Sequence, residues 1–78
     1  MSLNYSIIGL RIKEARLNKK ITQEKLAEKI DVSTAFIGNL ESNKIKQGLS
    51  VYTLYKLSKA LGVSVDDLLN ESKIKLTN

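Results

Sequence analysis

The chain has 78 residues, a length that accommodates one domain with a small core and excludes a separate catalytic domain. Hydrophobic residues make up 42% and charged residues 27% of the sequence, which predicts a globular fold. The chain contains no cysteine and no histidine, which excludes disulfides, thiolate or imidazole catalysis, and Cys/His zinc sites. We expect no metal and no cofactor.

The charge balance favours a polyanionic partner. Thirteen Lys and Arg residues against eight Asp and Glu residues give a net charge of +5. Nine of these basic and five of the acidic residues lie in residues 1–48, so we expect the anion-binding surface there. The sequence lacks both an apolar segment of about 18 residues and a secretory signal pattern. We therefore expect a cytoplasmic protein without membrane contact.

Apolar residues recur at helical spacing in the first half of the chain. They predict one helix at about 6–18 and a second at about 22–29, with Thr22 as the N-cap of the second. Asp31 tolerates the left-handed backbone conformation that ends a helix, and Ser33 is a good N-cap for the next one. Two short helices are therefore predicted on either side of a tight turn.

The third predicted helix, which starts at Ser33, has two unlike faces. Phe36, Ile37 and Leu40 share the apolar face. The other face is small and polar, which suits a helix that enters the major groove of DNA. The pattern alone leaves open an ordinary helical hairpin. The residues of this second face are Thr34, Ala35, Gly38, Asn39 and Ser42.

Residues 42–49 contain turn formers and predict a loop. Ser50 and Gly62 bracket a fourth helix, and a short fifth helix is predicted at about 65–70. Ser64 and Asp67 resemble a capping box at its start.

The predicted fold is all-α: a five-helix domain over residues 1–70, followed by a C-terminal tail at 71–78. The adjacent carboxylates Asp66 and Asp67 are better explained as first-turn helix residues than as a metal or acid–base site. We therefore expect that the chain is not an enzyme.

Five segments in order resemble the phage repressor/Cro-like helix-turn-helix family, often called Xre. They are IGLRI at 8–12, TQEKLA at 22–27, VS at 32–33, LE at 40–41 and ALGVSVDDLL at 60–69, together with Arg16, Ile37 and Lys44. The resemblance covers about residues 6–70. It implies a transcriptional regulator that binds double-stranded DNA. We expect a homodimer on a palindromic operator, because one small domain buries limited DNA surface and a second half-site supplies the specificity that one copy lacks.

The resemblance also implies roles for individual residues. Asn39 and Ala35 match positions that read adenine and the thymine methyl, whereas Gln23 and Lys44 match positions that contact phosphates. An ion pair between Arg16 and Glu41 is implied as a brace for the third helix. The full set of implied DNA contacts is Gln23, Ser33, Thr34, Ala35, Asn39, Ser42, Asn43, Lys44 and Lys46.

The sequence departs from the family pattern at several places. Lys20, Asp31 and Asn43 stand where the family commonly carries glycine, and a positive φ at Lys20 would cost about 1 kcal/mol. Lys25 replaces the usual acid of a capping box. The loop after Glu41 is about two residues longer than the common pattern and lacks its proline, so contacts at Lys46, Gln47 and Gly48 cannot be carried over from the family and stay open.

Two questions stay open at this point. Leu10 and Leu17 lie off the apolar stripe of the first helix, so they either form part of a partner surface or widen the core. The fold could also serve as a protein-interaction module or an antitoxin-like partner-binding protein instead of a DNA-binding regulator. If the protein is a dimer, we expect its interface around Tyr52, Tyr55, Leu69 and the tail.

Overall fold

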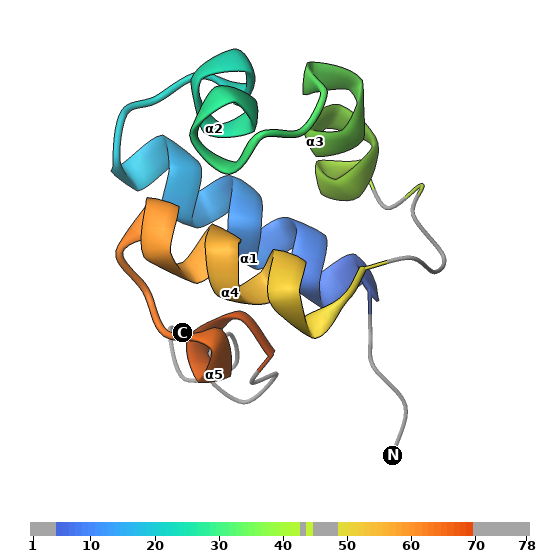
Figure 1. Ribbon diagram of the computed structural model, residues 1–78. Coiled ribbons are helices and arrows are strands. Elements are labelled where there is room, and N and C mark those ends of the chain that lie inside the picture. Colours follow the sequence, from blue (N-terminus) through green and yellow to red (C-terminus); the bar gives the residue numbers. More distant parts are fainter. Residues whose placement is uncertain (1–4, 43, 45–48, 70–78) are drawn as a thin grey trace.

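The computed structural model describes residues 5–42, 44 and 49–69. Within these ranges the chain forms helices and connecting turns without strands, which confirms the predicted all-α fold. No helix in the described part of the chain is long and apolar enough to cross a membrane. The helices are α1 (Tyr5–Asn18), α2 (Gln23–Ile30), α3 (Thr34–Glu41), α4 (Val51–Leu61) and α5 (Val65–Leu69) (Figure 1).

The predicted N-caps are confirmed. Thr22, Ser33 and Ser50 each accept a hydrogen bond from the backbone N–H three residues later, over 3.0, 3.0 and 3.1 Å. These bonds satisfy N–H groups that lack a partner in the first turn of a helix. At the other ends, Asp31 closes α2 and Gly62 closes α4, both in the left-handed conformation, with φ of 59° and 72°.

The turn between α1 and α2 contains the strained position that the sequence suggests. Lys20 has a φ of 61°, which costs a lysine about 1 kcal/mol relative to glycine. Its N–H donates to the carbonyl of Leu17 over 3.0 Å, and the next N–H, of Ile21, donates to the carbonyl of Arg16 over 3.3 Å. The turn is therefore tight although it lacks a glycine.

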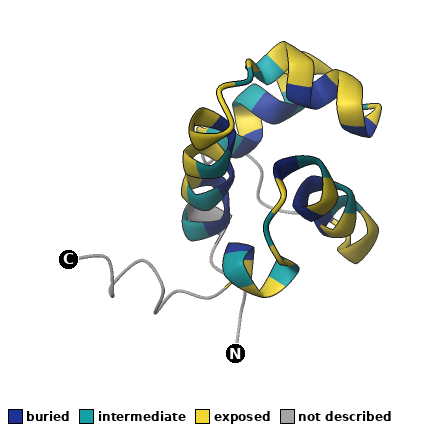
Figure 2. Ribbon diagram, turned by 90° about the vertical axis from the view of Figure 1, so that its left-hand side faces the viewer, coloured by how far each residue is buried: buried dark blue, intermediate teal, exposed yellow. Residues whose placement is uncertain are grey.

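Helix α1 lies at the centre of the fold and packs against α3, α4 and α5. The pair α2 and α3 lies on one side of α1 and α4, and α5 lies on the other (Figure 1). The faces turned toward the middle are buried and the outer faces are exposed (Figure 2). The core consists of Ile8, Ile12, Leu26, Ala27, Ile30, Ile37, Leu40, Leu49, Leu54, Leu57, Leu61 and Leu68.

A glycine allows α1 and α3 to approach each other closely. A Cβ atom placed on Gly9 would overlap the backbone carbonyl oxygen of Leu40, near the C-terminal end of α3. Because a backbone atom cannot move aside as a flexible side chain can, any larger residue would push the two helices apart. Gly9 therefore sets the distance between α3 and the centre of the fold.

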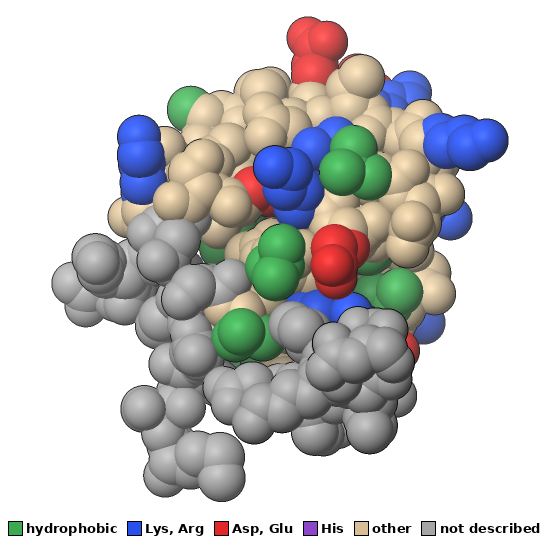
Figure 3. Space-filling view, turned by 180° about the vertical axis from the view of Figure 1, so that it is seen from behind, with side chains coloured by type: hydrophobic (Ala, Val, Ile, Leu, Met, Phe, Trp, Pro, Cys, Tyr) green, Lys and Arg blue, Asp and Glu red, His purple; other side chains and the backbone are tan. Residues whose placement is uncertain are grey.

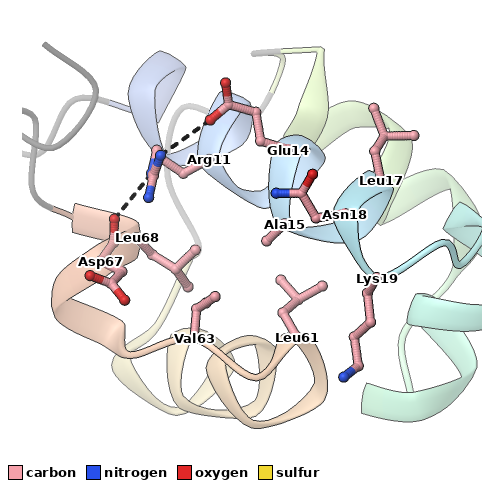
Figure 4. Close-up of a pocket in the computed structure, with 10 residues that line it drawn as sticks. All are labelled: Arg11, Glu14, Ala15, Leu17, Asn18, Lys19, Leu61, Val63, Asp67 and Leu68. Carbon is pink, nitrogen blue, oxygen red and sulfur yellow. Dashed lines mark hydrogen bonds and ion pairs between the residues drawn. The ribbon is translucent and has the colours of Figure 1, made fainter. Parts of the chain in front are cut away.

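Arg11 links α1 to α5. Its Nε atom donates to the carbonyl of Asp67 over 3.2 Å, and its Nη1 atom donates to the carboxylate of Glu14 over 3.2 Å. These residues border a recess of about 630 Å³ between α1 and the α4–α5 connection (Figure 4). None of the residues with predicted DNA contacts lines this recess, so it is separate from the candidate interface.

The two leucines that lie off the apolar stripe of α1 are exposed. Leu10 is 42% and Leu17 54% exposed, so the interpretation that they widen the core is wrong. On the face seen from behind, exposed hydrophobic side chains lie in separate patches between charged ones (Figure 3). This mixture is typical of a protein surface, where single exposed apolar residues are common.

Candidate nucleic-acid interface

Helices α2 and α3 are joined by a turn of three residues, Asp31, Val32 and Ser33. The N–H of Asp31 donates to the carbonyl of Glu28 over 3.3 Å, and the N–H of Val32 donates to the carbonyl of Ala27 over 3.0 Å. Val32 packs against the core, and Ser33 caps α3. Since every residue of the turn is held in this way, the orientation of α3 relative to α2 is well defined.

Helix α3 divides into the two faces that the sequence predicts. On the inner face Ile37 and Leu40 are buried, with exposed fractions of 0% and 1%. On the outer face Thr34, Ala35 and Asn39 are exposed. A row of small and polar side chains is thus presented to solvent by a helix whose opposite face is fixed in the core, an arrangement that suits entry into a groove about 12 Å wide.

A buried ion pair holds the C-terminal end of α3 against α1. Arg16 donates from Nε to Oε2 of Glu41 over 2.7 Å and from Nη2 to Oε1 over 3.0 Å. The two side chains are only 10% and 3% exposed. The third donor of Arg16, Nη1, bonds the carbonyl of Ile21 over 2.9 Å and so ties the α1–α2 turn to the same pair. This is the ion pair that the family resemblance implies.

The hydrogen bonds to Glu41 raise the pKa of Arg16 above its ordinary value, and burial opposes this effect. Arg16 therefore keeps its charge throughout the physiological pH range. Glu41 binds that charge bidentately inside the protein, so the guanidinium of Arg16 is engaged within the fold.

Gln23, the first residue of α2, contacts the same carboxylate. Its Nε2 atom donates to Oε1 of Glu41 over 3.1 Å, and its side chain is half-buried between α2 and α3. Sequence reasoning missed this contact, because the two residues are 18 positions apart and no local spacing connects them. Helices α2 and α3 are therefore joined by a polar contact as well as by the core.

The described residues after α3 lie next to its exposed face. Ser42 and Lys44 are both exposed, and the N–H of Lys44 donates to the carbonyl of Asn39 over 2.8 Å. This bond holds the backbone of Lys44 beside the last turn of the helix. Asn43 and Lys46, which were also predicted to contact DNA, lie outside the described residues.

Lys56, on α4, braces the turn from the other side, and the sequence reasoning missed it. Its ammonium group donates to the carbonyl of Ile30 over 2.9 Å, at the C-terminal end of α2. A cation at this end of a helix satisfies a carbonyl and complements the helix dipole. The same ammonium group lies 4.8 Å from the centroid of the Tyr52 ring, a cation–π contact.

The adjacent carboxylates at the start of α5 have a structural role. The N–H of Asp67 donates to Oγ of Ser64 over 2.9 Å, and the N–H of Ser64 donates to Oδ2 of Asp67 over 3.4 Å. This reciprocal pair confirms the predicted capping box. Asp66 lies in the same first turn, where an acid complements the helix dipole.

Comparisons with known proteins agree with this geometry. The immunity repressor protein of Bacillus phage phi105 is 34% identical over 67 residues, which cover 86% of this chain and 45% of the repressor. The control protein C.BamHI of Bacillus amyloliquefaciens is 35% identical over 69 residues, covering 87% of this chain and 83% of that protein. The chain thus spans about half the length of the phage relative.

Among solved structures, the biofilm regulator SinR in complex with DNA aligns with a TM-score of 0.75 and 38% identity. The alignment covers 81% of this chain and 98% of the SinR chain. The family model described as "Helix-turn-helix" matches residues 12–68, which run from the middle of α1 into α5. The chain therefore belongs to the helix-turn-helix family.

Proposed function

We propose that the chain binds duplex DNA, with α3 in the major groove, and regulates transcription. The observation that carries this proposal is the exposed, small and polar outer face of α3, on a helix whose inner face is held by the core and by the Arg16–Glu41 pair. The net charge of +5 supports binding to a polyanion. The SinR relative, whose structure contains DNA, supports the same conclusion.

The proposed interface has two parts. Thr34, Ala35 and Asn39 read base edges from the outer face of α3, where Asn39 can pair with adenine through two hydrogen bonds. A second set binds phosphates around this face and carries no sequence information. It consists of Gln23, Ser33, Ser42 and Lys44, to which we add Asn43 from the family pattern and Lys46 as a basic residue of the same loop.

We also propose that two copies bind a palindromic operator. A single small domain buries limited DNA surface, and two half-sites about 34 Å apart supply the specificity that one copy lacks. The proposed interface is the exposed apolar surface of α4 and α5, where Val51 is 79%, Tyr52 67%, Tyr55 51% and Leu69 37% exposed. A second copy would remove these side chains from water.

Selection from a random duplex library tests the proposal. We expect enrichment of a palindrome whose half-sites are about one helical turn apart, because a symmetric dimer reads the same bases twice. The affinity for the selected duplex should fall with salt, with a slope of about −0.9 in log–log form for each phosphate neutralised. Failure to bind any duplex at low salt would contradict DNA binding, and a single unrepeated half-site would contradict the dimer.

A protein-interaction module is the second candidate, favoured by the exposed Leu10 and Leu17 on α1. These side chains lie on a different element from the proposed DNA contacts. A pure interaction module would bind random duplex DNA hardly at all, even at low salt, and its variants at Leu10 and Leu17 would lose a protein partner. The salt titration described above therefore separates the two candidates.

A further inference from the structure

The carboxylate of Glu41 serves two different side chains. Its Oε2 atom accepts from Arg16, and its Oε1 atom accepts from both Arg16 and Gln23, over 3.0 and 3.1 Å. With a side chain only 3% exposed, the carboxylate has little access to water, so these donors take the place of its hydration. One buried group therefore determines the position of a structural arginine and of a residue at the proposed interface.

The carboxamide of Gln23 is confined on two sides. Its nitrogen is committed to Glu41, and its oxygen lies near Gly38, in the middle of α3. A Cβ atom on Gly38 would be 3.6 Å from that oxygen, so the carboxamide lies along the backbone of α3 where the side chain is missing. An amide nitrogen carries two hydrogens, which leaves one N–H of Gln23 for another acceptor.

We propose that Glu41 is a positioning residue for DNA binding: it orients the carboxamide of Gln23 so that its remaining N–H meets a phosphate oxygen. This inference rests on the proposed DNA binding and adds a role for Glu41 beyond bracing α3. The benefit is preorganisation, because the side chain of Gln23 is ordered before DNA arrives and loses less rotamer freedom on binding. The N–H donor of Gln23 is uncharged, and the Arg16–Glu41 pair behind it carries no net charge.

A double-mutant cycle on DNA affinity tests this role, with the duplex selected from the random library as the probe. We expect Gln23→Ala to weaken binding about tenfold, the size of one lost hydrogen bond to a charged group, without changing the salt slope. In Glu41→Gln one amide oxygen replaces two carboxylate oxygens, so the donors of Arg16 and Gln23 compete for it and the orientation of Gln23 is lost. Glu41→Gln should therefore weaken binding by a larger factor in the parent than in Gln23→Ala, where only the bracing of α3 is lost.

The outcomes are distinct. If Glu41→Gln weakens binding equally with and without the Gln23 amide, Glu41 acts on α3 as a whole and the inference is wrong. A change of salt slope in Gln23→Ala would also contradict it, because a neutral donor releases no counterion. If the unaltered chain binds no duplex, the proposed function itself fails, which is a separate result.

A measurement on the unaltered chain keeps the test independent of how Glu41→Gln folds. In ¹⁵N relaxation of the free protein, the side-chain amide of Gln23 should be ordered like the backbone, with an order parameter near about 0.85. The exposed amide of Asn39, on the outer face of α3, is the internal control and should be mobile. Equal mobility of the two amides would show that Glu41 does not position Gln23.

Discussion

The two faces of α3 differ in what holds them. The inner face is fixed by buried Ile37 and Leu40 and by the contact of Glu41 with Arg16, whereas Thr34 and Asn39 on the outer face are exposed to solvent. The inner face therefore sets where the helix lies, and the outer face is free to differ without changing the fold. Substitutions on the two faces should accordingly separate stability from DNA recognition.

The largest effect is expected at the ion pair behind α3. Arg16→Ala removes one partner of a buried pair and leaves the Glu41 carboxylate without its compensating charge, which should lower the free energy of unfolding by about 3 kcal/mol. For a domain of this size, thermal unfolding should then occur more than about 10 °C lower.

The exposed pair Lys25–Glu28, with side chains 56% and 73% exposed, provides the matched control. Lys25→Ala should change the free energy of unfolding by less than about 0.5 kcal/mol, since exposed ion pairs contribute little. Equal effects of Arg16→Ala and Lys25→Ala on a thermal melt would contradict the structural role of the buried pair.

Gly9→Ala should have the next largest effect. The added Cβ overlaps the carbonyl oxygen of Leu40, so α1 and α3 must separate, and we expect a loss of about 2 kcal/mol in urea denaturation. The better helix propensity of alanine offsets only part of this loss. Because α3 moves, DNA affinity should fall as well. A variant as stable as the parent would show that the contact between the two helices is loose.

On the outer face, Asn39→Ala should leave stability within about 0.5 kcal/mol of the parent. Its effect should appear in DNA binding, as a loss of discrimination of about 1–3 kcal/mol at one or two base pairs, because a bidentate contact to adenine is removed. Lys44→Ala is the control: it should weaken all sequences alike and reduce the salt slope by about one unit. Identical behaviour of the two variants would contradict the proposed division between base reading and phosphate binding.

Local features of the chain were predictable from the sequence. The N-caps act on the backbone N–H three residues later, as Thr22, Ser33 and Ser50 do. Gly62 ends α4 in the left-handed conformation. Each of these signals acts on residues only a few positions away in the sequence. The faces of α3 follow from helical periodicity. Because residues close together in the sequence determine these features, the helices and the outer face of α3 could be predicted from the sequence.

Tertiary polar contacts could not be predicted in this way. The bonds from Gln23 to Glu41 and from Lys56 to the carbonyl of Ile30 join residues 18 and 26 positions apart. Lysine and glutamine are common on helix surfaces, so neither residue stands out before the helices are packed. The Arg16–Glu41 pair was expected only because the family pattern implied it, and no spacing within the chain indicates it.

Apart from the control at Lys25, the smallest effect is expected at Gly38, and its sign is opposite to that at Gly9. Glycine in the middle of a helix is less favourable than alanine, and a Cβ here would be in ordinary van der Waals contact with Oε1 of Gln23, at 3.6 Å. Gly38→Ala should therefore raise the free energy of unfolding by about 0.5–1 kcal/mol. A decrease would mean that the methyl group displaces the carboxamide of Gln23, and DNA affinity would then fall together with stability. An increase with unchanged affinity would show that α3 can be stabilised without disturbing the side chains on either of its faces.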